Sequence, residues 1–223
     1  MENTAISLMQ EYYDRRAPVY DQSMQYDQPE TVVRQKPVID KLCHWMAGRT
    51  VLEIACGPGF WTTWVTQSAK SIVATDYNES TLVEARKKEI NQDRVNFRVA
   101  DAYALPDFGL LFDAAFGVDW FCHVPIKART RFLDGLHKKL EPNADIVFCD
   151  QLPRAEEGSS PVNSEDHFQV RTLPDGSEHR VIKNYPSESE VRAIFMPYAQ
   201  SIEYNSFPES RRWMVRYILR SVV

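Results

Sequence analysis

The sequence predicts a single α/β domain whose parallel sheet is covered by helices on both faces. Short apolar runs rich in β-branched residues alternate with helical segments of about 10–15 residues, which is typical of consecutive βαβ units. The predicted strands are almost continuously apolar, as expected for a sheet buried on both faces. With 223 residues, the chain has the length of one large domain or of one domain with additions.

The composition is that of a soluble globular protein and excludes several classes. Lys and Arg number 26 against 31 Asp and Glu, so the net charge is −5 and a strongly basic nucleic-acid-binding domain is excluded. No apolar run approaches the roughly 20 residues needed to cross a bilayer, and no secretory signal precedes the first helix. We therefore expect a cytoplasmic protein that acts on a small molecule, with neither nucleic acid nor membrane as its partner. The oligomeric state stays open.

The cysteines show no spacing typical of a metal site. None forms a C-x-x-C pair, and most lie inside apolar runs, so we expect buried free thiols and no bound metal. The four positions are Cys43, Cys56, Cys122 and Cys149.

The expected elements follow from hydrophobic periodicity. Helices are predicted over 3–16, 31–46, 60–69, around Leu82–Ala85 and over 127–140. Strands are predicted at 50–56, 71–75, 95–99, 112–118 and 144–150. The segment 153–166 reads as a long loop, and long loops in compact domains are often functional.

The first predicted strand ends in a glycine-containing turn, Glu53-x-Ala55-x-Gly57-x-Gly59. Glycines at such a turn let the backbone approach a ligand and leave amides free for its polar groups. A dinucleotide fingerprint needs a third glycine, and here Phe60 and Trp61 follow instead. The missing glycine argues against NAD as the cofactor.

Acidic residues occur at the ends of three consecutive predicted strands. Besides Glu53, these are Asp76, whose carboxylate can accept both hydroxyls of a ribose, and Asp101, which can accept from an adenine amine. Three acidic groups would repel a pyrophosphate. The pattern therefore indicates a nucleoside ligand without phosphates.

The run from Val51 to Thr62, VLEIACGPGFWT, resembles the first motif of class I S-adenosylmethionine-dependent methyltransferases, and Asp76 and Asp101-Ala102 match their second and third acidic positions. The resemblance implies a three-layer α/β/α doubly wound sheet of seven strands, the last antiparallel. It implies S-adenosylmethionine as the cofactor, with Asp76 at the ribose, Asp101 and the Ala102 amide at the adenine, and Tyr77 packed on its ring. The predicted cofactor-binding residues are Tyr20, Glu53, Ala55, Gly57, Gly59, Trp61, Asp76, Tyr77, Asp101 and Ala102.

A narrower resemblance concerns the substrate half. The stretches WFCHVP at 120–125 and RTLPDG at 171–176, with Lys183, are similar to the bacterial small-molecule branch that contains the phosphonate O-methyltransferase of dehydrophos biosynthesis. This implies one methyltransferase domain over 1–223, with a helical lid over 1–46 and a substrate loop and hairpin over 151–185. It also implies substrate contacts from Tyr26, Arg171 and Lys183, with Trp120 in the pocket wall. Tyr26 matches only with a one-residue shift.

The residues predict an anion site independently, through a hairpin. Pro174-Asp175-Gly176 suits a three-residue loop with glycine in the left-handed position. Such a loop would pair Arg171 with His179 and His167 with Lys183, which places these four side chains on one face. Phe168, Val170 and Ile182 would then lie on the other face. A two-residue loop would separate Arg171 from Lys183, and a solvated basic face is the competing interpretation.

We expect a methyltransferase that modifies an oxygen of a small, anionic metabolite such as a phosphonate or carboxylate. Arg171 would hold the anion through paired hydrogen bonds and Lys183 would add a point charge. His123 is the candidate catalytic residue: it would position an anionic substrate, or deprotonate a neutral one in the alternative of an N- or O-methyltransferase for neutral molecules. More distant alternatives are an NAD-dependent oxidoreductase and a non-catalytic nucleoside-binding module.

Overall fold

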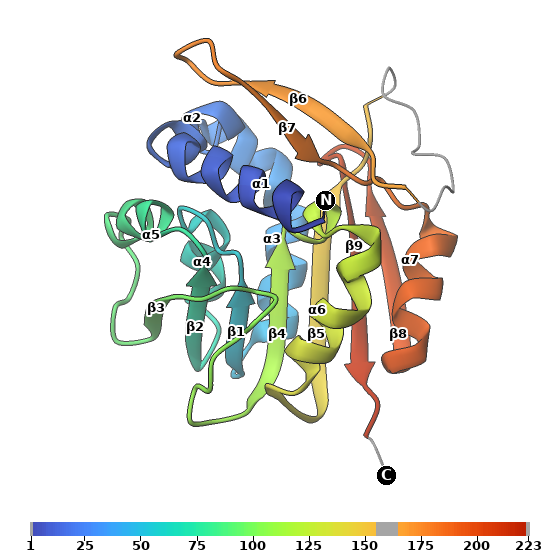
Figure 1. Ribbon diagram of the computed structural model, residues 1–223. Helices are drawn as coiled ribbons and strands as arrows, with labels where there is room; N and C mark the ends of the chain where they lie inside the picture. The colour runs from blue at the N-terminus through green and yellow to red at the C-terminus, as the bar shows by residue number, and fades with distance from the viewer. Residues whose placement is uncertain (1, 155–164, 222–223) are drawn as a thin grey trace.

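A computed structural model describes residues 2–154 and 165–221, which form three layers with a cap at one end (Figure 1). The central sheet has seven strands in the order β3-β2-β1-β4-β5-β9-β8. Their bounds are Val95–Val99 (β3), Ser71–Asp76 (β2), Thr50–Ile54 (β1), Phe112–Val118 (β4), Leu140–Gln151 (β5), Arg212–Leu219 (β9) and Ala199–Phe207 (β8). Strands β2 and β3 are added on one side of β1, and the chain then returns so that β4 pairs with the other side of β1.

The last strand alone runs against its neighbours. β9 pairs antiparallel with both β5 and β8, whereas β1 to β5 pair in parallel. The predicted doubly wound sheet of seven strands with an antiparallel last strand is therefore confirmed.

Helices cover both faces of the sheet. One core cluster packs α3 (Pro29–Met46), α4 (Phe60–Val65) and α5 (Glu79–Arg86) on one face. The other packs α6 (Arg129–His137) and α7 (Glu188–Phe195) on the opposite face. Short 3-10 turns lie at η2 (Phe121–His123), η3 (Ile126–Ala128) and η4 (Met196–Tyr198). No helix within the described ranges is both long and apolar enough to cross a membrane.

A cap of N-terminal helices and a hairpin lies over the carboxyl ends of the parallel strands (Figure 1). It consists of α1 (Glu2–Arg16), η1 (Ala17–Val19), α2 (Tyr20–Met24) and the hairpin strands β6 (Phe168–Thr172) and β7 (Glu178–Ile182). Met9 and Tyr12 of α1 pack against Val181 and Ile182 of β7 in a third, smaller core. The hairpin thus holds the first helix against the body of the protein.

The hairpin has the predicted register. Arg171 pairs with His179, the Leu173 amide donates to the Ser177 carbonyl at 3.0 Å, and the Lys183 amide donates to the His167 carbonyl at 2.8 Å. Gly176 occupies the left-handed position at φ +83°. On the face that carries Arg171 and Lys183, Lys183 is only 3% exposed and Arg171 is half-buried, so Lys183 is not solvated.

Several element boundaries differ from the prediction. The helix predicted over 60–69 ends at Val65, and Leu140 belongs to β5, because it pairs with Phe112 across the sheet. The hydrophobic pattern does not predict α2, α7, β8 or β9, although a capping box between Ser187 and Glu190 marks the start of α7. The predicted loop at 153–166 lies mostly outside the described residues.

A buried carboxyl group on β1 fixes the start of the helical layer. Glu53 is 2% exposed, and the Thr62 hydroxyl of α4 donates to its Oε2 at 2.7 Å. Burial raises the pKa of Glu53 to about 8, although the hydrogen bond from Thr62 acts in the opposite direction. Glu53 is therefore protonated in the folded protein at neutral pH.

We expect the Glu53→Gln variant to lose a pH dependence of stability that the wild type shows. Between about pH 5 and pH 8 the folded wild type keeps a proton that the unfolded chain has released. Its free energy of unfolding should therefore fall as the pH rises, by at most about 1.4 kcal/mol per pH unit.

Urea unfolding across this range measures the effect. The stability of Glu53→Gln relative to wild type should increase toward pH 8, whereas the exposed Glu141→Gln control should not show this trend. Parallel curves for wild type and Glu53→Gln would contradict the protonated state.

Candidate active site

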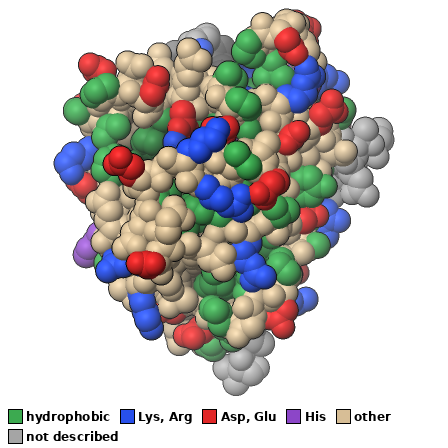
Figure 2. Space-filling view, turned by 90° about the vertical axis from the view of Figure 1, so that its left-hand side faces the viewer, with side chains coloured by type: hydrophobic (Ala, Val, Ile, Leu, Met, Phe, Trp, Pro, Cys, Tyr) green, Lys and Arg blue, Asp and Glu red, His purple; other side chains and the backbone are tan. Residues whose placement is uncertain are grey.

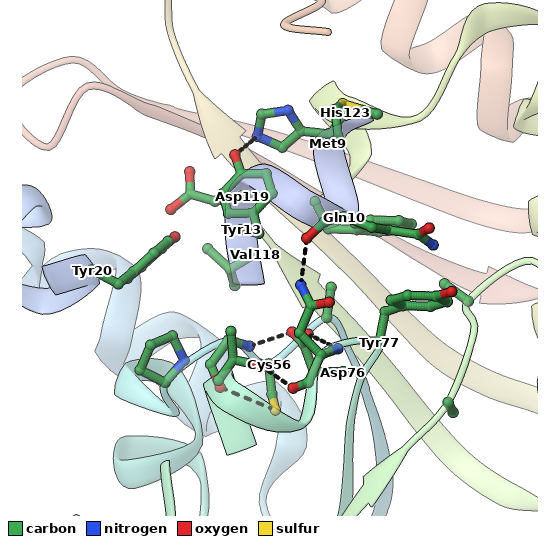
Figure 3. Close-up of a pocket in the computed structure, with 18 of the residues that line it drawn as sticks. Met9, Gln10, Tyr13, Tyr20, Cys56, Asp76, Tyr77, Val118, Asp119 and His123 are labelled. Atoms are coloured by element: carbon green, nitrogen blue, oxygen red, sulfur yellow. Dashed lines mark hydrogen bonds between the residues drawn. The ribbon is translucent and has the colours of Figure 1, made fainter. Parts of the chain in front are cut away.

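A cavity of about 100 Å³ lies where the carboxyl ends of β1, β2 and β4 meet α1 (Figure 3). Its floor comes from the turn after β1 and from the ends of the neighbouring strands, and its roof comes from the first helix. The α1 side chains that line it are Ile6, Met9, Gln10 and Tyr13. The Gln10 carbonyl accepts from the Asn78 side-chain amide at 3.0 Å, which links the roof to the end of β2.

The turn after β1 adopts a backbone that few side chains tolerate. Ala55, Gly57 and Gly59 all have positive φ, at +53°, +54° and +78°. A Cβ on Gly59 would also lie 3.1 Å from that of Ala85, so glycine lets α4 start close to α5. The Gly57 amide donates to Asp76 Oδ2 at 2.9 Å, which joins the turn to the end of β2.

The two strand-end aspartates line this cavity side by side. Asp76 Oδ1 accepts from the Asn78 amide at 3.0 Å, and Asp101 Oδ1 accepts from the Tyr103 amide at 2.9 Å. Burial raises the pKa of Asp76, and hydrogen bonds from Asn78 and Gly57 oppose that shift. Each carboxylate keeps lone pairs for a hydroxyl or amine in the cavity.

Two buried indole groups in the cavity wall have unused donors. The Nε1 atoms of Trp61 and Trp120 make no hydrogen bond within the described part of the chain. A buried donor without a partner is costly, so these N–H groups favour a ligand that brings acceptors. Tyr77 lines the rim and is 47% exposed.

The structure brings together most of the predicted cofactor-binding residues. Glu53 and Gly59 lie outside the lining, where they support the turn, and the other eight line the cavity: Tyr20, Ala55, Gly57, Trp61, Asp76, Tyr77, Asp101 and Ala102. The predicted substrate residues Tyr26, Trp120 and His123 also line it.

A second cavity of about 420 Å³ adjoins the first and is strongly basic. The two share the wall residues Tyr13, Tyr20, Tyr26, Asp119 and His123. Asp119 is the one carboxylate in the described lining of the second cavity, against seven cationic side chains: Arg16, Arg34, Arg154, Arg171, Lys183, Arg211 and Arg212. On the surface in Figure 2, by contrast, basic and acidic side chains are interspersed.

The predicted anion ligands both lie in this basic cavity. Lys183 Nζ donates to the Cys122 sulfur at 3.1 Å, and no carboxylate of the described residues lies within 4.0 Å of it. Burial opposes its charge, but Cys122, Asp119 and Asp150 together raise the pKa of Lys183, so it stays charged. Arg171 donates to Gln169 and forms no ion pair with a described residue.

A buried ion pair forms part of the shared wall. Arg212 is 2% exposed and donates to both carboxylate oxygens of Asp119, at 3.0 and 2.9 Å. Burial alone would raise the pKa of Asp119, but the guanidinium lowers it to about 2. The Tyr26 hydroxyl accepts from Arg212 at 3.0 Å and donates to Asp119 at 3.2 Å, while its ring stacks on Phe60.

A hydrogen bond between α1 and the η2 turn forms another part of the shared wall. The Tyr13 hydroxyl lies 2.8 Å from His123 Nε2 (Figure 3). His123 Nδ1 contacts the Ile182 carbonyl. Since a carbonyl only accepts, Nδ1 carries the proton and Nε2 accepts from Tyr13. Burial and the nearby Lys183 lower the pKa of His123 to about 3, so the imidazole is neutral.

Sequence reasoning missed part of this site. Asp119 directly follows β4, so its position at a strand end could have identified it by the same rule as Asp76. Tyr13, Arg16 and Arg212 gave no such signal, because the fold brings them in from the two ends of the chain. No group of His, Cys, Asp or Glu suited to a metal ion occurs among the residues that the structure describes.

Residues 51–143 match a family model described as a methyltransferase domain. The chain is 32% identical over 105 residues to demethylmenaquinone methyltransferase of Clavibacter sepedonicus, a match covering 47% of this chain and 42% of that protein. The chain thus spans less than half the length of this curated relative.

Two solved structures of DhpI superpose over almost the whole chain. The complex with SAH has a TM-score of 0.81 and 22% identity, covering 100% of both chains. The complex with SAM and HEP has a TM-score of 0.79 and 24% identity, covering 95% of this chain and 96% of that one. The predicted resemblance is confirmed: the chain carries a methyltransferase domain and has the fold of the class I S-adenosylmethionine-dependent methyltransferases.

Proposed function

We propose that this protein transfers a methyl group from S-adenosylmethionine to an oxygen of a small anionic metabolite, such as a phosphonate or carboxylate. The observation that carries the proposal is a pair of basic residues, Lys183 and Arg171, in a cavity that shares a wall with the predicted cofactor cavity. Leaving a cation as buried as Lys183 without an ionic partner is costly, and an anionic substrate would provide that partner.

The smaller cavity has the donors and acceptors that S-adenosylmethionine requires. Asp76 and Asp101 offer acceptors for ribose hydroxyls and an adenine amine, and the unpaired Trp61 indole offers a donor for the methionine carboxylate. The bound cofactor would supply an activated methyl group on a sulfonium centre. DhpI, which shares the fold, has been solved with SAM and with SAH.

The turn itself disfavours a dinucleotide. Thr62 stands where a dinucleotide fingerprint that begins at Gly57 and Gly59 has its third glycine. Phe60, which directly follows the turn, is buried and stacks on the ring of Tyr26 at 3.8 Å between ring centroids. The two aspartates would also repel a pyrophosphate. These features favour S-adenosylmethionine over NAD.

The closed N-terminal segment would exclude water from the reaction. The cavity volume of about 100 Å³ is smaller than is usual for a site that binds a ligand of this size. Four side chains of α1 line the cavity and reduce its volume. The sequence predicts a lid over residues 1–46. Because α3 packs on the sheet within that range, we assign only α1 and α2 to the lid that opens and closes over the site. Closure would align the acceptor, which is the main requirement of an in-line transfer.

An anionic oxygen can accept the methyl group without a general base, and the side chains in the larger cavity fit such a substrate. Arg171 would hold the anion through paired hydrogen bonds, and Lys183 would fix it by charge. His123 accepts from Tyr13 and has a pKa of about 3, which makes it a weak base. We therefore assign His123 to positioning Tyr13 rather than to deprotonating a neutral substrate.

S-adenosylhomocysteine should bind to the wild type and stabilise it against heat, whereas NAD should not. Asp76→Asn should weaken S-adenosylhomocysteine binding by about 10- to 100-fold, because the replacement amide offers fewer acceptors to the ribose hydroxyls. Titration calorimetry measures both effects. Asp40→Asn, exposed on α3, is the matched control. Tighter binding of NAD would contradict the proposed cofactor.

Arg171→Ala and Lys183→Ala should each raise the KM for an anionic acceptor by at least about tenfold, since each removes a charged hydrogen bond to the substrate. The affinity for S-adenosylhomocysteine should change little, because neither residue lines the smaller cavity. A labelled-methyl assay against phosphonates, carboxylates, phenols and amines measures this and identifies the acceptor class.

Lys36→Ala, whose side chain is exposed and paired with Asp40, is the control for removal of a positive charge. Undiminished activity in the Arg171→Ala, Lys183→Ala double variant would disprove the anion site. Cofactor binding without turnover on any acceptor class would instead indicate a binding module.

A further inference from the structure

Backbone strain is concentrated at the two cavities. Five residues other than glycine have positive φ, namely Gln25, Ala55, Asp119, Asn143 and Arg211, within the part of the chain that the structure describes. Four of them line a cavity, and Asn143 does not. Asparagine tolerates this conformation, but for the others it costs on the order of 1 kcal/mol each.

Arg211 is the least expected of these residues. It ends the turn between β8 and β9 at φ +52°, and its amide donates to the Pro208 carbonyl at 2.9 Å. Turns of this kind favour glycine at the left-handed position. The guanidinium of Arg211 lines the basic cavity and donates to the Leu152 carbonyl at 3.3 Å.

A second arginine, Arg34, is held beside this turn by buried contacts. The hydroxyl of Ser210 donates to the Arg34 carbonyl at 2.6 Å, and the Gln35 amide donates to the Ser210 carbonyl at 3.2 Å. Ser210 is 5% exposed and Gln35 equally so. The side chains of Arg34 and Arg211 are exposed and line the basic cavity. Arg34 donates to the Thr31 hydroxyl at 3.1 Å, and neither arginine forms an ion pair with a described residue.

Arg34 and Arg211 come from other elements than the predicted anion ligands, namely from α3 and the β8–β9 turn. Lys183 contacts Cys122, next to His123 in the wall shared with the cofactor cavity. Arg212, although adjacent in sequence, is neutralised by Asp119. The lining of the cavity therefore includes one cationic pair from the hairpin segment and another from α3 and the β8–β9 turn.

We propose that Arg34 and Arg211 form a second anion-binding subsite, so that the substrate carries two acidic groups. This rests on the proposed function: Lys183 and Arg171 hold the acid that is methylated, and Arg34 and Arg211 hold a carboxylate, phosphate or phosphonate at the other end of the same molecule. The second contact sets the orientation of the substrate and selects against acceptors with one acidic group.

The test compares acids with one and two charged ends on the protein loaded with S-adenosylhomocysteine. The probes are alkylphosphonates and phosphonoalkanoates of matched chain length, and titration calorimetry gives their affinities. Wild type should bind the best two-acid probe at least about tenfold more tightly than its one-acid counterpart. Arg211→Gly should abolish most of this preference while leaving the affinity for the one-acid probe unchanged.

Arg211→Gly suits the test because glycine relieves the strained φ, so the variant should unfold at the same temperature as wild type or higher. Asn143→Gly, at φ +63° and outside both cavities, is the matched control and should keep the full preference. Arg34→Gln should reproduce the loss.

The outcomes separate the two proposals. An equal preference in wild type and Arg211→Gly, or no preference in wild type, overturns the second subsite alone. If Arg211→Gly weakens the binding of both probes equally, the second subsite is also overturned, because Arg211 would then act only through the overall positive potential of the cavity. Failure of both probes to bind wild type overturns the proposed anionic substrate and the subsite together.

Discussion

A buried ion pair joins the end of β4 to the start of β9, and both cavities depend on it. Asp119 leaves β4 with a strained φ of +56°, and Arg212 meets its carboxylate with two hydrogen bonds. Such a pair is weak evidence for stability, because desolvation offsets much of the attraction, but loss of one partner leaves a buried charge. Its contribution here is geometric. It fixes Tyr26, and Tyr26 stacks on Phe60 at the start of α4.

Two sets of contacts position the wall between the cavities, and the first begins at this pair. Arg212 also donates to Gln35, and Gln35 donates to Ser210, so α3 and the β8–β9 turn are placed by the same group. On the other side, Tyr13 donates to His123, and His123 donates to the Ile182 carbonyl of the hairpin. The lid, the hairpin and the sheet therefore meet at the wall between the two cavities, where a methyl group would have to pass.

The smaller cavity is lined by acidic groups and the larger one by cationic groups, because they come from different parts of the fold. Asp76 and Asp101 lie at the ends of adjacent strands, as the carboxyl edge of a parallel sheet requires, and give the smaller cavity acceptors. The cationic groups of the larger cavity come from many elements: α1, α3, the segment after β5, the hairpin, the β8–β9 turn and the start of β9. A neutral nucleoside and an anionic acceptor would thus occupy separate environments divided by aromatic rings and one neutralised carboxylate.

Local sequence pattern is sufficient to predict the strands β1 to β5, the glycine turn, its aspartates and the register of the hairpin. Each depends on residues close together in the chain: apolar runs, a left-handed glycine at position 176 and acids that directly follow strands. Long-range packing is what turns the basic hairpin face inward, pairs Arg212 with Asp119, and brings Tyr13, Arg34 and Arg211 to the cavities. These contacts join residues more than 90 positions apart, and local pattern carries no information on which distant partner a buried charge will meet.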